Sequence, residues 1–90
     1  MTEDRVTMIK RLRMRSMRRG IKEMDLILSA FAAAKLDGLS DADLTLYDAL
    51  LTENDHDIYA WIGGQLAVPE RYRTLMADIS AVSEGVTRPA

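Results

Sequence analysis

The 90-residue chain is long enough for one small domain, and its composition excludes several classes of protein. Hydrophobic residues make up 48% of it and charged residues 29%, which is too apolar a composition for a disordered chain. It contains no cysteine, so disulfides, thiolate metal sites and cysteine nucleophiles are excluded. The longest apolar stretch, residues 26–36, is interrupted by Ser29 and Lys35 and is too short to span a bilayer.

The net charge of −2 conceals an uneven distribution along the chain. Residues 1–24 carry eight Lys/Arg and three Asp/Glu, a net of +5, whereas residues 25–90 carry four and eleven, a net of −7. Either the basic segment faces an acidic partner, or the two parts of the chain neutralise each other within the fold. The sequence alone leaves both interpretations open.

Two helices are predicted in the first 35 residues, separated near Gly20. The first extends from about residue 4 to residue 17, with Met8, Ile9 and Leu12 as a narrow apolar stripe among basic residues. The second reaches about residue 35, and the Asp37-Gly38 turn follows it. Its apolar stripe recurs at helical spacing and consists of Ile21, Met24, Leu28 and Phe31, with Ile27 and Ala34 beside it.

Three shorter helices are predicted in the rest of the chain. Ser40 and Asp43 form a capping pattern at the start of the third helix, and Asp55 is expected to cap the fourth. Gly63-Gly64 ends the fourth helix, and Pro69 suits the first turn of the fifth. Their predicted core residues are Leu44, Tyr47, Leu50, Leu51, Ile58, Trp61, Ile62, Tyr72, Leu75, Met76 and Ile79.

No segment alternates between apolar and polar residues with a period of two, so no sheet is expected. We therefore predict an all-α protein, a compact bundle of about five short helices joined by short loops. Residues 1–82 are expected to form its single domain. Residues 83–90, which include Gly85 and Pro89, are expected to form a flexible C-terminal tail.

No catalytic residue and no metal site is predicted. His56 is the only histidine, and one histidine cannot supply the three or four ligands of a zinc site. The sequence contains no nucleophile elbow, Walker loop, dinucleotide-binding glycine pattern or calcium-loop spacing. The basic segment lacks interleaved aromatic residues and the pI is about 5.3, which argues against nucleic acid. The same lack of aromatic anchors argues against a helix lying on a membrane.

Residues 18–25, Arg-Arg-Gly-Ile-Lys-Glu-Met-Asp, contain the pattern Arg-Gly-x-x-Glu. This segment resembles the signature of the FAD assembly factor family, also called succinate dehydrogenase assembly factors. The resemblance covers about residues 5–80, although some relatives carry proline at the position of His56. Further matching positions follow in order: Asp25-Leu26, Phe31, Leu50-Leu51, Asp55-x-Asp57-Ile58-Tyr59-x-Trp61, Gly64 and Pro69.

The same motif has a purely structural interpretation. Gly20 can end one helix and cap the next, and Arg18 and Arg19 suit the negative C-terminal end of the first helix. Glu23, in the first turn of the second helix, could accept a hydrogen bond from the backbone N–H of Gly20. The two interpretations are compatible, because a rigid corner can present a binding surface.

The resemblance implies an assembly factor that is not itself an enzyme. Such a protein binds the flavoprotein subunit of succinate dehydrogenase, and of the related fumarate reductase, and promotes covalent attachment of FAD to a histidine of that subunit. The flavin and the flavoprotein supply the chemistry. The residues expected to bind the partner are Arg18, Arg19, Gly20 and Glu23 of the motif, with Met17, Lys22 and Met24 beside it.

Several properties of the molecule follow as expectations from this resemblance. We expect a chaperone-like protein that holds no FAD stably, is a monomer when free, binds no nucleic acid and does not insert into membranes. Because the first helix begins close to residue 1, a bacterial cytoplasmic location is expected. The alternative is an antitoxin-like regulatory module that binds another protein through the same surface.

Overall fold

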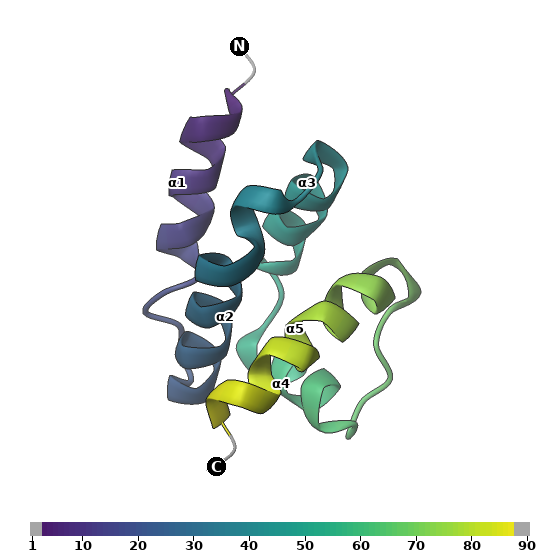
Figure 1. The fold of residues 1–90 in the computed structure, drawn as a ribbon. Coiled ribbons are helices and arrows are strands. Elements are labelled where there is room, and N and C mark those ends of the chain that lie inside the picture. The colour runs from purple at the N-terminus through teal and green to yellow at the C-terminus, as the bar shows by residue number, and fades with distance from the viewer. Residues whose placement is uncertain (1–2, 88–90) are drawn as a thin grey trace.

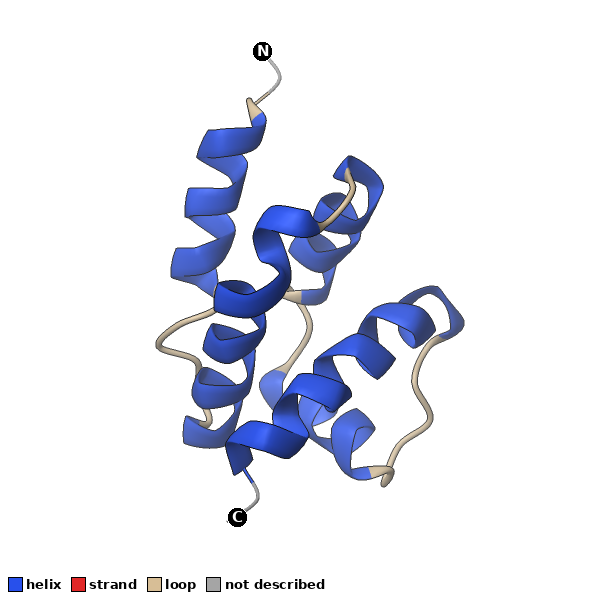
Figure 2. Ribbon diagram, viewed as in Figure 1, coloured by secondary structure: helices blue, strands red, loops and turns tan. Residues whose placement is uncertain are grey.

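The computed structural model of the protein describes residues 3–87, and in this range the chain forms helices joined by short loops. No strand occurs among these residues, so the predicted all-α class and the predicted set of five α-helices are confirmed (Figure 2). Short 3-10 helices, η1 (Leu36–Gly38) and η2 (Glu70–Tyr72), follow α2 and precede α5. The α-helices are α1 (Arg5–Arg15), α2 (Lys22–Lys35), α3 (Asp41–Leu50), α4 (Asp55–Gly63) and α5 (Arg73–Thr87).

The helix ends follow from local hydrogen bonds, two of which differ from the prediction. Ser40 caps α3 as expected, with its side chain accepting from the N–H of Asp43 at 3.1 Å. Helix α4 is capped by Asn54, whose side chain accepts from the N–H of His56, and not by Asp55. Pro69 precedes η2 and does not lie in the first turn of α5.

The last two helices, α4 and α5, end differently. Gly64 ends α4 in the left-handed conformation with φ of 80°, which glycine adopts without steric cost. Helix α5 does not stop at residue 82, where the domain was expected to end, but continues to Thr87. Ser83 is buried, so the start of the predicted tail belongs to the packed domain. Residues 88–90 of that tail lie outside the described residues.

Helix α2 is the element around which the other helices pack. It makes its most extensive contacts with α5, which crosses it in the lower part of the molecule as drawn, and it also contacts α1 and α4 (Figure 1). Helix α1 approaches from above and runs along the opposite side to α4 (Figure 1). The corner between α1 and α2 therefore lies on an outer edge of the bundle.

The core consists of the apolar faces that the helical periodicity predicts, with few exceptions. Residues with 0% exposure come from every helix of the bundle and include Leu12, Phe31, Tyr47, Ile58 and Ile79. Trp61 and Ile62 are partly buried against this core, and the Trp61 ring lies 5.9 Å from that of Tyr72. Ala34, which lies beside the predicted stripe of α2, is exposed.

Ion pairs hold α1 against α3 beside its narrow apolar stripe. Asp48 of α3 accepts from both terminal nitrogens of Arg11 at 2.9 Å and from Arg15 Nη1 at 2.5 Å. The other two arginines of α1 bind acidic residues near the start of α3: Arg5 with Asp41 at 2.8 Å and Arg13 with Asp37 at 2.7 Å. The basic first segment is thus largely neutralised within the fold, one of the two interpretations that the sequence allows.

Asp48 provides a test of how strongly these pairs hold α1. Arg11, through its hydrogen bonds, holds the pKa of the Asp48 carboxyl below its ordinary value. We expect Asp48→Asn to lower the free energy of unfolding by about 1 kcal/mol at pH 7. A lowered folded-state pKa stabilises the fold above the ordinary carboxyl pKa, and this stabilisation disappears as the pH falls through the folded-state value.

Urea unfolding at pH 7 and at acid pH, followed by circular dichroism, measures this effect. The difference between the variant and wild type should vanish in acid, where the wild-type carboxyl is also protonated. Asp78→Asn, at an exposed position on α5, is the matched control and should change little at either pH. An equal loss for both variants, or a difference that persists in acid, would contradict the role given to Asp48.

Candidate partner-binding surface

The corner between α1 and α2 is built on a buried polar contact beneath it. Ser16, which is 0% exposed, donates to the carbonyl oxygen of Leu12 at 2.7 Å and lies 2.6 Å from the hydroxyl of Tyr47. Burial raises the pKa of Tyr47 to about 12, so this hydroxyl stays protonated at neutral pH. The last turn of α1 is thereby attached to α3 directly below the motif.

Asp55, at the start of α4, binds two successive residues of the motif. Its Oδ1 accepts from Arg19 Nε at 2.9 Å and pairs with Nη2 at 2.7 Å, and its Oδ2 accepts from the N–H of Gly20 at 2.8 Å. The side chains of Arg19 and Asp55 are only 11% and 15% exposed. Pairs shielded in this way are screened less by solvent than surface pairs.

The rest of the Arg19 guanidinium is also used within the chain. Its Nη1 donates to the carbonyl oxygen of Arg15 at 2.9 Å, and its Nη2 donates to that of Leu51 at 3.2 Å. We expected Arg19 to offer its donors to a partner. In this structure they instead join the ends of α1 and α3 to the start of α4, so the structural interpretation applies to Arg19.

Glu23 has the opposite environment. It was expected to accept from the N–H of Gly20, but that N–H donates to Asp55. Glu23 is exposed in the first turn of α2, and it forms no hydrogen bond or ion pair with any other described residue. Its carboxylate is therefore available at the surface, next to Gly20.

Gly20 is a glycine that the fold itself does not require. Its φ lies outside the left-handed region, and a Cβ built on it would meet only the Asp55 side chain, at 3.4 Å, an ordinary van der Waals distance. The N–H that binds Asp55 is a backbone group, which any residue except proline would supply. A side chain at this position would therefore extend outward from the surface of the corner.

Arg18 occupies the left-handed region with φ of 55° and is the non-glycine residue that does so in the described range. This conformation costs an L-residue about 1–2 kcal/mol. The N–H of Arg18 donates to Asp25 Oδ1 at 2.8 Å, which fixes the backbone, while its side chain extends into solvent. Residues held in such conformations concentrate at functional sites.

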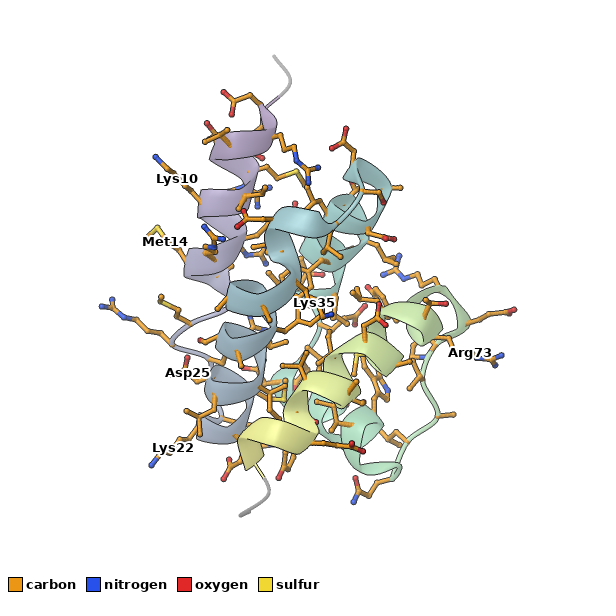
Figure 3. The ribbon with its side chains drawn as sticks, in the orientation of Figure 1. Lys10, Met14, Lys22, Asp25, Lys35 and Arg73 are labelled. Atoms are coloured by element: carbon orange, nitrogen blue, oxygen red, sulfur yellow. The ribbon has the colours of Figure 1, made fainter. Side chains whose placement is uncertain are left out.

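The exposed cations near the corner are fewer than the sequence suggested. Lys10, Arg18 and Lys22 form no ion pair within residues 3–87, whereas the arginines of α1 and Arg19 are paired. Lys10 on α1 and Lys22 on α2 project from the same side of the molecule (Figure 3). Among residues 3–87, these three exposed side chains of residues 1–24 are the cations left without an ion pair.

The two methionines predicted beside the motif lie in different environments. Met17 is 50% exposed, but Met24 is 0% exposed and belongs to the core, as its place in the apolar stripe of α2 indicates. Two exposed apolar residues were not predicted for this surface: Met14, 74% exposed, and Leu26, 48% exposed. Leu26 falls outside the core spacing of α2, a signal that could have identified it.

The described part of the chain offers neither a metal site nor a membrane-spanning helix. Among residues 3–87, no group of three or more acidic or histidine side chains is arranged to hold a metal ion. None of the helices in this range is both long and apolar enough to cross a bilayer. The corner at residues 17–23 is thus the surface where exposed motif residues gather.

The fold and this surface define a class of protein: a small helical protein whose corner between two helices carries the pattern Arg-Gly-x-x-Glu. The model of one protein family, described as the flavinator of succinate dehydrogenase, matches residues 10–83. The match covers the second half of α1, all of α2, α3 and α4, and α5 up to residue 83. The chain therefore belongs to this family.

Individual relatives agree with the family match. The chain is 54% identical over 59 residues to succinate dehydrogenase assembly factor 2, mitochondrial, of Meyerozyma guilliermondii, which covers 66% of this chain and 44% of that protein. It is 42% identical over 72 residues to the protein of the same name from Schizosaccharomyces pombe, covering 80% and 52%. It is also 47% identical over 47 residues to FAD assembly factor SdhE of Legionella pneumophila strain Lens, covering 52% and 60%.

The chain spans roughly half the length of these relatives. The family and the names of the relatives favour a flavinator, and do not favour the antitoxin-like alternative. Because mitochondrial proteins of fungi match as well as a bacterial protein, the comparisons do not confirm a bacterial cytoplasmic location.

The role of Arg19 within the chain can be tested with a conservative exchange. Lysine keeps the charge but cannot reach Asp55 and two carbonyl oxygens at once. We expect Arg19→Lys to lower the free energy of unfolding by about 2 kcal/mol. Arg18→Lys, one residue away and exposed, should stay within about 0.5 kcal/mol of wild type in the same urea unfolding experiment. Equal effects of the two exchanges on the free energy of unfolding would refute the structural role of the Arg19 bonds to Asp55 and the two carbonyl oxygens.

The backbone strain at Arg18 predicts an unusual difference between two truncations. Alanine keeps the unfavourable left-handed conformation, whereas glycine adopts it freely. We expect Arg18→Gly to be about 1 kcal/mol more stable than Arg18→Ala, the reverse of the usual order for these residues. Thermal and urea unfolding of the two variants measure this difference, and a more stable alanine variant would show that the corner is not strained.

Proposed function

We propose that this protein promotes covalent attachment of FAD to the flavoprotein subunit of succinate dehydrogenase by docking on that subunit. The observation that carries the proposal is Gly20, an exposed glycine for which the fold has no internal need, in a chain of the flavinator family. The names of the relatives describe assembly of succinate dehydrogenase and of FAD, which supports this partner.

The proposed docking surface differs from the one expected from the sequence. It contains the exposed residues at the corner, Met17, Arg18, Gly20, Lys22 and Glu23. Arg19 and Met24 support it from within, the first through the bonds to Asp55 and the second through the core. At Gly20 the backbones of the two proteins can approach closely, since no side chain intervenes.

The proposed action is positioning, not catalysis by groups of this chain. A docked protein that holds the flavoprotein in one conformation can align the flavin with the side chain that attacks it, which accelerates bond formation through orientation. The flavin and the flavoprotein supply the reacting atoms. Arg18, Lys22 and Glu23 would set the orientation of docking through charge complementarity.

The remaining expectations about this protein are part of the proposal. We propose that the FAD is held by the flavoprotein and not stably by this chain, which has no glycine-rich phosphate-binding loop in its sequence. We propose a free monomer in the bacterial cytoplasm, the latter supported by the Legionella relative. The fumarate reductase flavoprotein is a second partner to examine in the same assay.

The test is covalent flavin on the succinate dehydrogenase flavoprotein, read by fluorescence in a denaturing gel. Cells that lack this gene should lose the signal, and wild type should restore it. Gly20→Arg should fail to restore it, because the new side chain projects from the site of closest approach. A signal that is unchanged by deletion, or one restored equally by Gly20→Arg, would refute the proposal.

Two controls separate a lost surface from a lost fold. The free energy of unfolding of Gly20→Arg should lie within about 1 kcal/mol of the wild-type value. A Cβ at this position meets only the Asp55 side chain, at an ordinary van der Waals distance of 3.4 Å. Ala77→Arg places the same side chain at an exposed position on α5, away from the corner, and should restore full flavin attachment. A Gly20→Arg protein that is unfolded would show instead that the fold requires this glycine.

A further inference from the structure

A small pocket lies between α1 and α2 on the side of the corner. It has a volume of about 120 Å³ and is lined by Met17 and Arg13 from the α1 side and by Ser29, Ala32 and Ala33 of α2. The pocket exists because α2 presents only small side chains along this part of its length. An apolar cavity of about 150 Å³ holds a benzene ring, so this pocket suits a single aliphatic or aromatic side chain.

Exposed apolar groups extend from the pocket across the same face. Met14, in the last turn of α1, is 74% exposed, and its carbonyl oxygen accepts from the N–H of Met17 at 3.2 Å. Leu26, 48% exposed, shares a side of α2 with Ala33, two turns further along. Figure 3 shows Lys10 and Met14 of α1 projecting on the same side as Lys22 and Asp25 of α2. The pocket therefore belongs to a partly apolar surface continuous with the corner.

The charges around this surface define the chemistry of the occupant. Lys10, Arg18 and Lys22 lack ion-pair partners in the described part of the chain, and the carboxylates beside them are Glu23 and Asp25. Cations therefore outnumber carboxylates by three to two around the apolar centre. A second copy of this chain would bring these like charges together across a symmetric contact, which is unfavourable. A segment with one apolar side chain flanked by carboxylates is complementary in both respects.

We propose that the pocket receives one apolar side chain of the flavoprotein, projecting from an acidic segment of its surface. This inference rests on the proposed function, since it assigns the occupant to the same partner. Met17 lines the pocket and lies three residues from Gly20, so one partner surface can cover both. A buried apolar anchor surrounded by polar contacts is the arrangement that dominates the affinity of many interfaces.

Filling the pocket tests the proposal without touching the motif. Ala33 is exposed and lines the pocket, so Ala33→Met should occupy it and leave the fold intact. Ala34→Met places the same side chain on the same helix, exposed but outside the pocket. We expect Ala33→Met to weaken binding to the purified flavoprotein about tenfold by calorimetry, a loss of about 1.4 kcal/mol. Ala34→Met should bind within twofold of wild type.

A charge reversal examines the acidic surroundings of the anchor. Lys10 is exposed on α1, beyond the motif, and Lys10→Glu should slow association about fivefold while dissociation changes little. Stopped-flow or surface-based kinetics at low and high salt measure this, and the difference should shrink as salt screens the charges. Faster association of Lys10→Glu would show that the facing surface is basic, and would overturn the acidic part of the proposal.

The outcomes distinguish this inference from the proposed function. If wild type binds and Gly20→Arg does not, but Ala33→Met binds as wild type, the docking surface stands and the pocket is refuted. If wild type shows no binding to the flavoprotein, the proposed function and the inference that rests on it both fail. A concentration-dependent dimer in sedimentation, abolished by Ala33→Met, would assign the pocket to a second copy and overturn the inference.

Discussion

The carboxylate of Asp55 binds two successive residues of the α1–α2 corner to the start of α4. One oxygen binds the Arg19 guanidinium and the other binds the N–H of Gly20, so the middle of the α1–α2 corner is fixed to the start of α4. Arg19 extends the connection to the carbonyl oxygens at the ends of α1 and α3. The positions of Gly20, Arg18 and Glu23 at the surface depend on this group of bonds.

The three signature residues of the family motif consequently have separate roles. Arg19 is shielded and acts within the chain. Gly20 and Glu23 are exposed: the backbone N–H of Gly20 binds Asp55, and Glu23 forms no hydrogen bond or ion pair among residues 3–87. Under the proposed function, one short pattern serves both as a structural corner and as a docking surface. Ion pairs of its arginines with α3 and with Asp55 leave the basic segment with only a few exposed, unpaired cations among the described residues. Recognition can then depend on shape at Gly20 as much as on charge.

Helix positions and most of the core could be predicted because each helix buries a single face with a regular period. Residues such as Leu28, Leu44 and Ile79 are buried as that period requires. The role of Asp55 could not be predicted, because a carboxylate at a helix start is locally explained as a cap, and its partners lie 35 and 36 residues away. The sequence placed Met24 both in the core stripe and on the surface, and periodicity was the better guide. Binding by Met17, Arg18, Lys22 and Glu23 stays a prediction.

The dependence of the corner on Asp55 limits how far the surface can be separated from the rest of the protein. A synthetic hairpin of α1 and α2 would contain the whole signature, yet it would lack Asp55 and the Leu51 carbonyl oxygen that orient Arg19. The bond from the N–H of Arg18 to Asp25 would remain, but residues 19 and 20 would no longer be held by Asp55, so the left-handed conformation of Arg18 would be free to relax. A peptide mimic or inhibitor built on this motif therefore needs a substitute for the start of α4, such as a covalent staple at the corner.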